Sequence, residues 1–249
     1  MTIVLAVYIT LTGLILGSFY NVVALRVPVG ESLLRPSSRC TSCGTQLTAR
    51  DLVPVLSYLL SGGKCRHCGA KVSPLYMLGE AATGLLFLGV YMRFGLTGNG
   101  VIGWMLVSLS VIVTVADLRF MLIPNKVLLF FLPLLLWLVI VFPGGPLWSH
   151  LLGGVVGCVI VLLLALLGGM GMGDVKLFAL LGWVVGFPNV LLAFLIACAL
   201  GTVAGGTLML LGRVKRKQPI PFGPWLAAGS MIAFSYGSHL ISGYLALIR

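Results

Sequence analysis

The stretch GGMGMGDVK, residues 168–176, joins two long apolar runs of the chain. It contains Asp174, the only acidic residue in the last 132 positions. A carboxylate at or inside a membrane boundary is costly, so its default interpretation is functional, and the surrounding glycines let other backbone approach closely. The alternative is that Asp174 only N-caps a helix beginning at Val175, because Asp is a preferred cap residue. This stretch alone supports the two interpretations equally.

A second isolated acid changes that balance. Asp117 lies in VADLRFMLIPN at the end of another apolar run, and no Asp or Glu separates it from Asp174. Two close carboxylates do not ionise together easily, so they share a proton, and one acts as a base on water while the other acts as an acid. The sequence therefore predicts that Asp117 and Asp174 form a pair.

The composition excludes a soluble globular protein. Of the 249 residues, 59% are hydrophobic and 8% are charged, and the mean hydropathy is +1.14. The apolar runs cover residues 3–25, 75–92, 101–118, 127–143, 151–168, 175–187, 190–212 and 225–247. Most are long enough to cross a hydrocarbon core, which takes about 20 residues, although the run 175–187 is short. We expect an all-α polytopic membrane protein with about eight transmembrane helices.

The net charge of +11 is a topology signal. If both chain ends lie outside and the runs alternate, 14 of the 16 Lys and Arg residues lie inside. They fall in the segments 26–74, 119–126, 169–176 and 213–224. This asymmetry follows the positive-inside rule and places Asp117 and Asp174 on the same, inner face. The basic excess therefore predicts contact with anionic membrane lipids and no nucleic-acid partner.

Residues 26–74 form the only sizeable hydrophilic segment, and it carries two cysteine pairs. Cys40 and Cys43 form one CxxC pair, Cys65 and Cys68 form another, and 21 residues separate the pairs. This spacing is typical of a four-cysteine zinc site, and disulfides are rare in the cytosol, where the charge pattern places the loop. Because so small a loop cannot bury much of a core, zinc would be structural. The alternative is four free thiols in an unstructured loop.

Three polar residues lie close to this loop in the sequence. Asn21 and Arg26 end the first apolar run, and Glu80 lies early in the second. Periodicity alone favours a helix–helix contact for Asn21 and a snorkelling side chain for Arg26. Glu80 is an intramembrane acid. A functional role is supported equally with a structural one, in which Glu80 pairs with Arg26 or Lys71 or is held neutral near the interface.

The motifs together resemble those of the type IV prepilin peptidases, which are intramembrane aspartic proteases related to other GxGD enzymes. GMGMGDVK and DLRFMLIPN are similar to the two aspartate motifs of that family. The resemblance covers nearly the whole chain through GSFYNVVALRVP, PSSRCTSC, CRHC, PVLSYLLSGG, SPLYMLGE and IPFGPW. Asn125 is a departure, because many members carry an acid after the Ile-Pro pair.

The resemblance implies an enzyme of the bacterial inner membrane, in which the charge pattern places both termini in the periplasm and the cysteine loop in the cytosol. Such enzymes cleave the basic leader from type IV prepilins and type II secretion pseudopilins at the cytoplasmic face. Asp117 and Asp174 match the catalytic aspartates, and the N-terminal segments of prepilins or pseudopilins are the expected partners.

The resemblance also implies a second activity. Members with the cysteine loop usually methylate the new N-terminal amine with S-adenosylmethionine. We expect residues 1–93, with the loop 26–74, to form the methyltransferase part, in which Glu80, Asn21 and Arg26 bind the cofactor. Residues 94–249 would form the aspartic peptidase part.

Two other functions are consistent with parts of the sequence. In a transporter or channel, Glu80, Asp117 and Asp174 would relay protons or bind cations, although that function favours acids near the middle of the bilayer. In a scaffold, the zinc loop would dock a partner protein, which leaves the isolated aspartates without a role.

Overall fold

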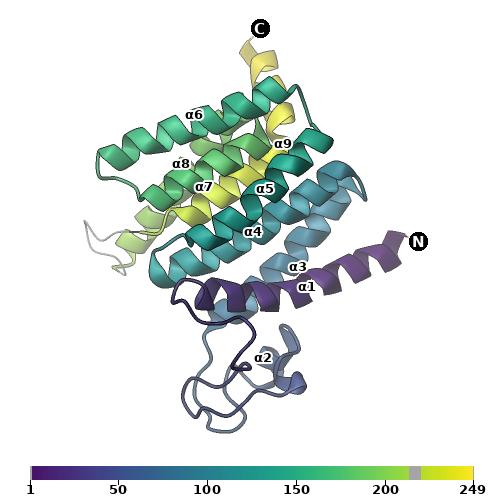
Figure 1. Cartoon of the computed structure of the whole chain (residues 1–249), viewed down its shortest axis with the longest axis vertical. Helices are drawn as coiled ribbons and strands as arrows, with labels where there is room; N and C mark the ends of the chain where they lie inside the picture. The colour runs from purple at the N-terminus through teal and green to yellow at the C-terminus, as the bar shows by residue number, and fades with distance from the viewer. Residues whose placement is uncertain (1, 213–219, 249) are drawn as a thin grey trace. The chain divides into compact units, whose positions relative to one another are not determined.

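The computed structural model describes residues 2–212 and 220–248, and the regular elements in these ranges are all helices (Figure 1). Their bounds are α1 (Thr2–Arg26), η1 (Ala49–Asp51), α2 (Leu56–Leu60), α3 (Pro74–Phe94), α4 (Gly98–Phe120), α5 (Asn125–Val141), α6 (Leu147–Leu166), α7 (Met172–Val185), α8 (Asn189–Leu210) and α9 (Gly223–Ile248). Two isolated bridges are the only extended pairings among these residues. The predicted all-α fold class is confirmed.

Each predicted apolar run corresponds to one long helix, α1 or one of α3 to α9. Within the described residues, five helices are long and apolar enough to cross a membrane: α1, α3, α4, α6 and α8. Helix α5 is apolar but has 17 residues, and α7 has 14. The chain is therefore a helical membrane protein, and eight spans stay a prediction.

Part of the charge pattern that predicts the topology falls beyond these ranges. Arg213, Lys215, Arg216 and Lys217 of the predicted inner segment lie outside the described residues, as does the C-terminal Arg249.

The chain divides into two compact units, residues 1–95 and 96–249. The first unit holds α1, η1, α2 and α3, and the second holds α4 to α9. The assignment of methylation to residues 1–93 and of peptidase activity to 94–249 stays a prediction.

In the first unit, α1 and α3 pack closely through small residues. A Cβ atom added at Gly13 would lie 2.9 Å from the Gly84 Cα, and one added at Gly17 would lie 2.9 Å from the Glu80 Cα. Backbones this close need glycine, as is common where membrane helices associate by packing alone. The contact brings the end of α1, with Asn21, against the first turns of α3, with Glu80.

In the second unit, α7 lies among α5, α6 and α9 (Figure 1). Leu177, Phe178 and Leu181 of α7 are fully buried. Gly153 of α6 and Gly182 of α7 meet backbone to backbone, so no side chain separates the two helices there. Helix α7 is therefore a core element of this unit, although it is its shortest helix.

The C-terminal end of α7 is held by the start of α6. The Phe187 N–H donates to the Ser149 carbonyl oxygen at 2.9 Å, and the Ser149 hydroxyl donates to the Phe187 carbonyl at 2.6 Å. The His150 Nδ1 lies 2.9 Å from the Trp183 carbonyl oxygen, one of the acceptors that a helix end leaves without an intrahelical partner. These bonds limit sliding of α7 and so help to place Asp174 at its other end.

Candidate functional site

Asp117 lies in the last turn of α4 and is held by the start of α9. The backbone N–H of Gly223, the first residue of α9, donates to the Asp117 Oδ2 at 2.9 Å. The first N–H groups of a helix lack intrahelical acceptors, so they are available to a carboxylate. Only 6% of Asp117 is exposed. A Cβ atom at Gly223 would lie 2.8 Å from the same Oδ2, so this contact requires glycine.

The turn after Asp117 connects the two aspartate motifs. Helix α4 ends where Met121 takes a left-handed conformation (φ 51°), and its N–H donates to the Asp117 carbonyl oxygen at 2.8 Å. The helix thus ends at Phe120, three residues before Ile123. The chain then passes Ile123 against α7, where its Cβ would lie 3.0 Å from a Cβ added at Gly173.

Asp174 lies inside the first turn of α7. The helix begins at Met172 with Gly171 at the N-cap, so the alternative that Asp174 caps a helix starting at Val175 is wrong. As the third helical residue, Asp174 reaches back, and its Oδ2 accepts the Gly171 N–H at 3.1 Å. Glycine supplies no side chain for a reciprocal bond, so this is one half of a capping box. Asp174 is half-buried.

The fold brings the two aspartates together. Ile123, which follows the end of α4, lies against Gly173, the residue directly before Asp174. Each Oδ2 is held by one glycine N–H, whereas the Oδ1 atoms have no hydrogen bond within the described part of the chain. Among the same residues no cation pairs with either carboxylate. Two such groups can share one proton and present two free oxygens to a water molecule.

The four predicted zinc ligands also converge, through two similar turns. The Gly44 N–H donates to the Cys40 carbonyl, and the Gly69 N–H donates to the Cys65 carbonyl, both at 2.9 Å. The two glycines have φ values of +72° and +71°, a conformation that other residues rarely adopt. Each CxxCG sequence therefore forms a tight knuckle that turns its two thiols to the same side.

The geometry of the cluster fits a tetrahedral zinc ion. Bonds of about 2.3 Å from zinc to sulfur place two sulfurs about 3.8 Å apart. The Cys40 and Cys68 Sγ atoms are 3.8 Å apart, and all four sulfurs lie within 4.8 Å of one another. None forms a disulfide, whose sulfurs would be about 2.05 Å apart. The four-cysteine cluster can therefore hold a metal ion.

Backbone N–H groups favour the thiolate form of some of these cysteines, which is the form that binds metal. The Cys43 and Ser42 N–H groups lower the pKa of Cys40, and the Cys68 and His67 N–H groups do the same for Cys65. The Ala70 N–H lowers the pKa of Cys68, but desolvation and the neighbouring thiols outweigh it and raise the value to about 11. Four thiolates without a cation repel one another, so the last proton is lost when metal binds.

Removal of one thiol tests the zinc site. Cys43→Ser is expected to weaken zinc binding by at least about a hundredfold, since even residues behind the ligands contribute up to that factor. Metal analysis of the purified protein measures the loss, and trypsin should then cleave the loop 26–74 faster. Cys158→Ser, which removes a lone thiol of α6, is the control. Wild-type protein without zinc under reducing conditions would contradict the assignment.

The predicted cofactor residues lie in the first unit but do not all point to one place. The Asn21 Nδ2 donates to the Tyr76 carbonyl at 2.9 Å, and its Oδ1 is buried without a partner among the described residues. The Glu80 Oε2 accepts the Val55 N–H at 2.8 Å and so ties the loop to α3. Arg26 instead donates to the Ser32 carbonyl at 3.0 Å, where it stabilises the first turn of the loop. Asn21 and Glu80 share the α1–α3 interface, and Arg26 bonds to the loop.

Sequence reasoning pointed to the glycines around Asp174, Gly171 among them, but not to the other residues that hold these groups. Gly223 and Gly171 position the two carboxylates, and Gly44 and Gly69 shape the metal cluster. A glycine directly after each CxxC pair is a visible signal for the knuckles. No local signal connects Gly223 to Asp117, because 106 positions separate them.

Two family models match the chain. The model described as the bacterial peptidase A24 N-terminal domain matches residues 11–94, and that of the type IV leader peptidase family matches residues 104–206. The second range includes both aspartates, and the first includes the four cysteines.

Curated relatives match over nearly the full length. A prepilin leader peptidase/N-methyltransferase of Bacillus subtilis is 40% identical over 237 residues, which is 94% of this chain and 96% of the relative. Proteins with the same name from Stutzerimonas stutzeri and Aeromonas salmonicida are 32% and 33% identical over 95% and 96% of this chain, and over 92% and 93% of their own lengths. No solved structure matches.

Proposed function

This chain belongs to the prepilin leader peptidase/N-methyltransferase family, and from that premise we propose that Asp117 and Asp174 are its catalytic pair. The protein is an enzyme that removes the leader peptide of prepilins and methylates the product. The transporter hypothesis finds no support, because the relatives that match over most of the chain are enzymes of this kind. The scaffold hypothesis leaves the aspartate pair without a role.

The observation that carries the mechanism is the pair of free Oδ1 atoms on two carboxylates held by glycine N–H groups. One carboxylate takes a proton from a water molecule, whose oxygen attacks the scissile carbonyl carbon. The other donates its proton to the leaving amine nitrogen. The pair begins and ends the cycle with one shared proton, so its titration belongs to the pair. Cleavage of a prepilin peptide by the purified protein tests this function, and the absence of product would contradict it.

The glycines before Asp174 support this role. Gly168 has a φ of +79°, and a Cβ atom at Gly169 would meet only one neighbouring atom, the Leu164 carbonyl oxygen at 3.4 Å. Gly168, Gly169 and Gly171 thus place no side chain where it would obstruct an extended substrate, although Met170 and Met172 lie between them and Asp174. Because the leader is basic and is removed at the cytoplasmic face, a site at the C-terminal end of α4 and the first turn of α7 suits it. We propose that type II secretion pseudopilins are also substrates.

The proposed location is the bacterial inner membrane, with both termini in the periplasm and the loop 26–74 in the cytosol. The basic residues of the loop support this orientation. A cysteine introduced at Ser61 should resist a membrane-impermeant thiol reagent applied to whole cells, whereas one at Gly145 should react. Gly145 suits the experiment because an added Cβ meets no atom within 4 Å. The opposite labelling pattern would invert the topology.

The methylation site is proposed at the α1–α3 interface. S-adenosylmethionine, when bound, would supply the methyl group for the new N-terminal amine and would leave as a neutral thioether once its bond from sulfur to that methyl carbon breaks. The sulfonium and amino groups of this cofactor are cationic, and the interface offers acceptors: the buried Asn21 Oδ1 and the second carboxylate oxygen of Glu80. Arg26 would act on the carboxylate end of the cofactor or through the loop turn that it holds.

The substitution Glu80→Gln is expected to reduce methylation much more than cleavage. The amide can still accept the Val55 N–H, so the loop stays docked, but the negative charge is lost. Methylation and S-adenosylmethionine binding should each fall at least about tenfold, the size expected for one bond to a charged group. Cleavage should change less than about twofold. Equal loss of both activities, with binding unchanged, would make Glu80 a docking residue of the loop.

A further inference from the structure

An apolar groove runs along the second unit between α5, α6 and α7. Its volume is about 730 Å³. Its walls include Leu128 and Leu132 of α5, Leu151 and Val155 of α6, and Ala179 and Trp183 of α7. Exposed apolar side chains along it, such as Leu132 at 40% and Val155 at 52%, indicate that the groove is open at its side.

One end of the groove is polar. Lys176 and Asn125 line it, and the Lys176 Nζ donates to the Asn125 Oδ1 at 3.0 Å. Helices α5 and α7 both begin at this end, and α5 begins after Pro124 with no side-chain cap. The positive ends of two helix dipoles therefore lie beside a lysine.

The charge of Lys176 is not neutralised within the described part of the chain. Its partner Asn125 is neutral, and no acidic side chain forms an ion pair with it there. An aspartate at position 125 would form an ion pair with Lys176, whereas the neutral Asn125 only accepts a hydrogen bond from it. In this chain Lys176 therefore keeps its positive charge at the polar end of the apolar groove.

We propose that this groove binds an anionic phospholipid, with the phosphate at Lys176 and one acyl chain along the groove. The two ends of the site match the two parts of such a lipid in charge and polarity. From Asn125 to Leu136, the last residue of α5 in the groove, the helix rises about 16 Å. That length is close to the roughly 15 Å of hydrocarbon in one leaflet. The bound lipid would pack against α7, the helix that carries Asp174.

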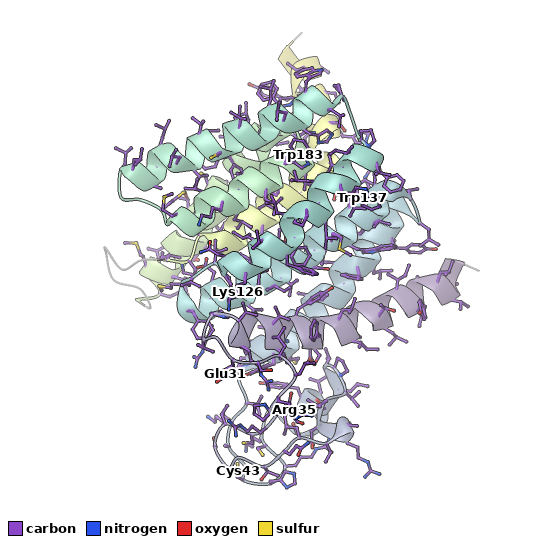
Figure 2. The ribbon with its side chains drawn as sticks, viewed as in Figure 1. Glu31, Arg35, Cys43, Lys126, Trp137 and Trp183 are labelled. Atoms are coloured by element: carbon purple, nitrogen blue, oxygen red, sulfur yellow. The ribbon has the colours of Figure 1, made fainter. Side chains whose placement is uncertain are left out.

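Trp183 lies in the groove and serves as a reporter. A variant that keeps only this tryptophan replaces the other four by phenylalanine, at Trp104, Trp137, Trp148 and Trp225. The full chain is reconstituted with phosphatidylglycerol or phosphatidylcholine that carries bromine on its acyl chains, which quenches a nearby indole. A second variant keeps only Trp137, which is 61% exposed on α5 outside the groove (Figure 2) and reports the general lipid contact.

Brominated phosphatidylglycerol should quench Trp183 at an about fivefold lower mole fraction than phosphatidylcholine, the ratio that one cation near anionic lipid provides. The ratio should be near one for Trp137. Asn125→Asp gives Lys176 an ionic partner and leaves the number of heavy atoms in the groove unchanged. It should abolish the preference for phosphatidylglycerol at Trp183. A ratio at Trp183 that equals the one at Trp137, or that Asn125→Asp leaves unchanged, would overturn the proposal.

A second measurement keeps the test independent of the tryptophan replacements. Native mass spectrometry of the chain with all five tryptophans should show more retained phosphatidylglycerol than phosphatidylcholine. The Asn125→Asp variant should retain less phosphatidylglycerol than the wild-type chain. Equal retention would overturn the proposal. A prepilin peptide that changes the Trp183 fluorescence to the same extent in both lipids would also overturn the proposal, because the substrate would then occupy the groove.

Discussion

Asp117→Asn and Asp174→Asn are each expected to lower the rate of prepilin cleavage by about a thousandfold or more. General acid–base catalysis by a positioned group contributes a factor of about 10² to 10⁴, and here each carboxylate depends on the proton of the other. An asparagine keeps the size of the side chain and can still accept the N–H of Gly223 or Gly171, so the fold should persist. It cannot take up or release the catalytic proton.

The two effects should not add. Residues that act as one unit lose most of their contribution when either is removed, so the double variant should be no slower than the slower single variant. Cleavage of a purified prepilin in detergent or vesicles measures this. Asp51→Asn is the matched control, because Asp51 is an acid of the loop that bonds to Thr48 and pairs with Arg66. A single aspartate variant with a near-normal rate would return that residue to a purely structural role.

Gly223→Ala is expected to reduce cleavage by about ten- to a hundredfold without unfolding the protein. The new methyl group would lie 2.8 Å from the Asp117 Oδ2 and 3.4 Å from its Cγ, closer than a carboxylate oxygen tolerates. The carboxylate must then rotate or shift away from the N–H that holds it. A displacement of about 1 Å in a catalytic group can cost about a hundredfold in rate.

The control for this prediction is another glycine of the same unit. Gly206→Ala in α8 adds a methyl group that meets no atom within 4 Å, so cleavage should be unchanged. Methylation of a precleaved peptide should persist in Gly223→Ala if the two sites are separate. Full cleavage by Gly223→Ala would show that the bond from Gly223 does not position Asp117.

Much of the fold follows from local signals in the sequence. Hydropathy locates every long helix, because a segment buried in lipid must be apolar along its length and must satisfy its backbone bonds internally. The cysteine spacing predicts the metal cluster for a similar reason, since each CxxC pair forms a knuckle from a few consecutive residues. The predicted start of one helix was wrong: α7 begins at Met172, three residues before the apolar run 175–187, so Asp174 lies inside the helix.

The sequence by itself thus determined the helical membrane class, the cysteine cluster and the two isolated aspartates as candidates for one site. Only the tertiary structure decided what surrounds them. The bond from Gly223 to Asp117 and the contact of Lys176 with Asn125 join residues that are 106 and 51 positions apart. Such contacts depend on how whole helices pack, and packing is set by small residues such as Gly153 and Gly182 meeting across an interface. No periodicity or spacing within one segment records which residue another helix will bring beside it.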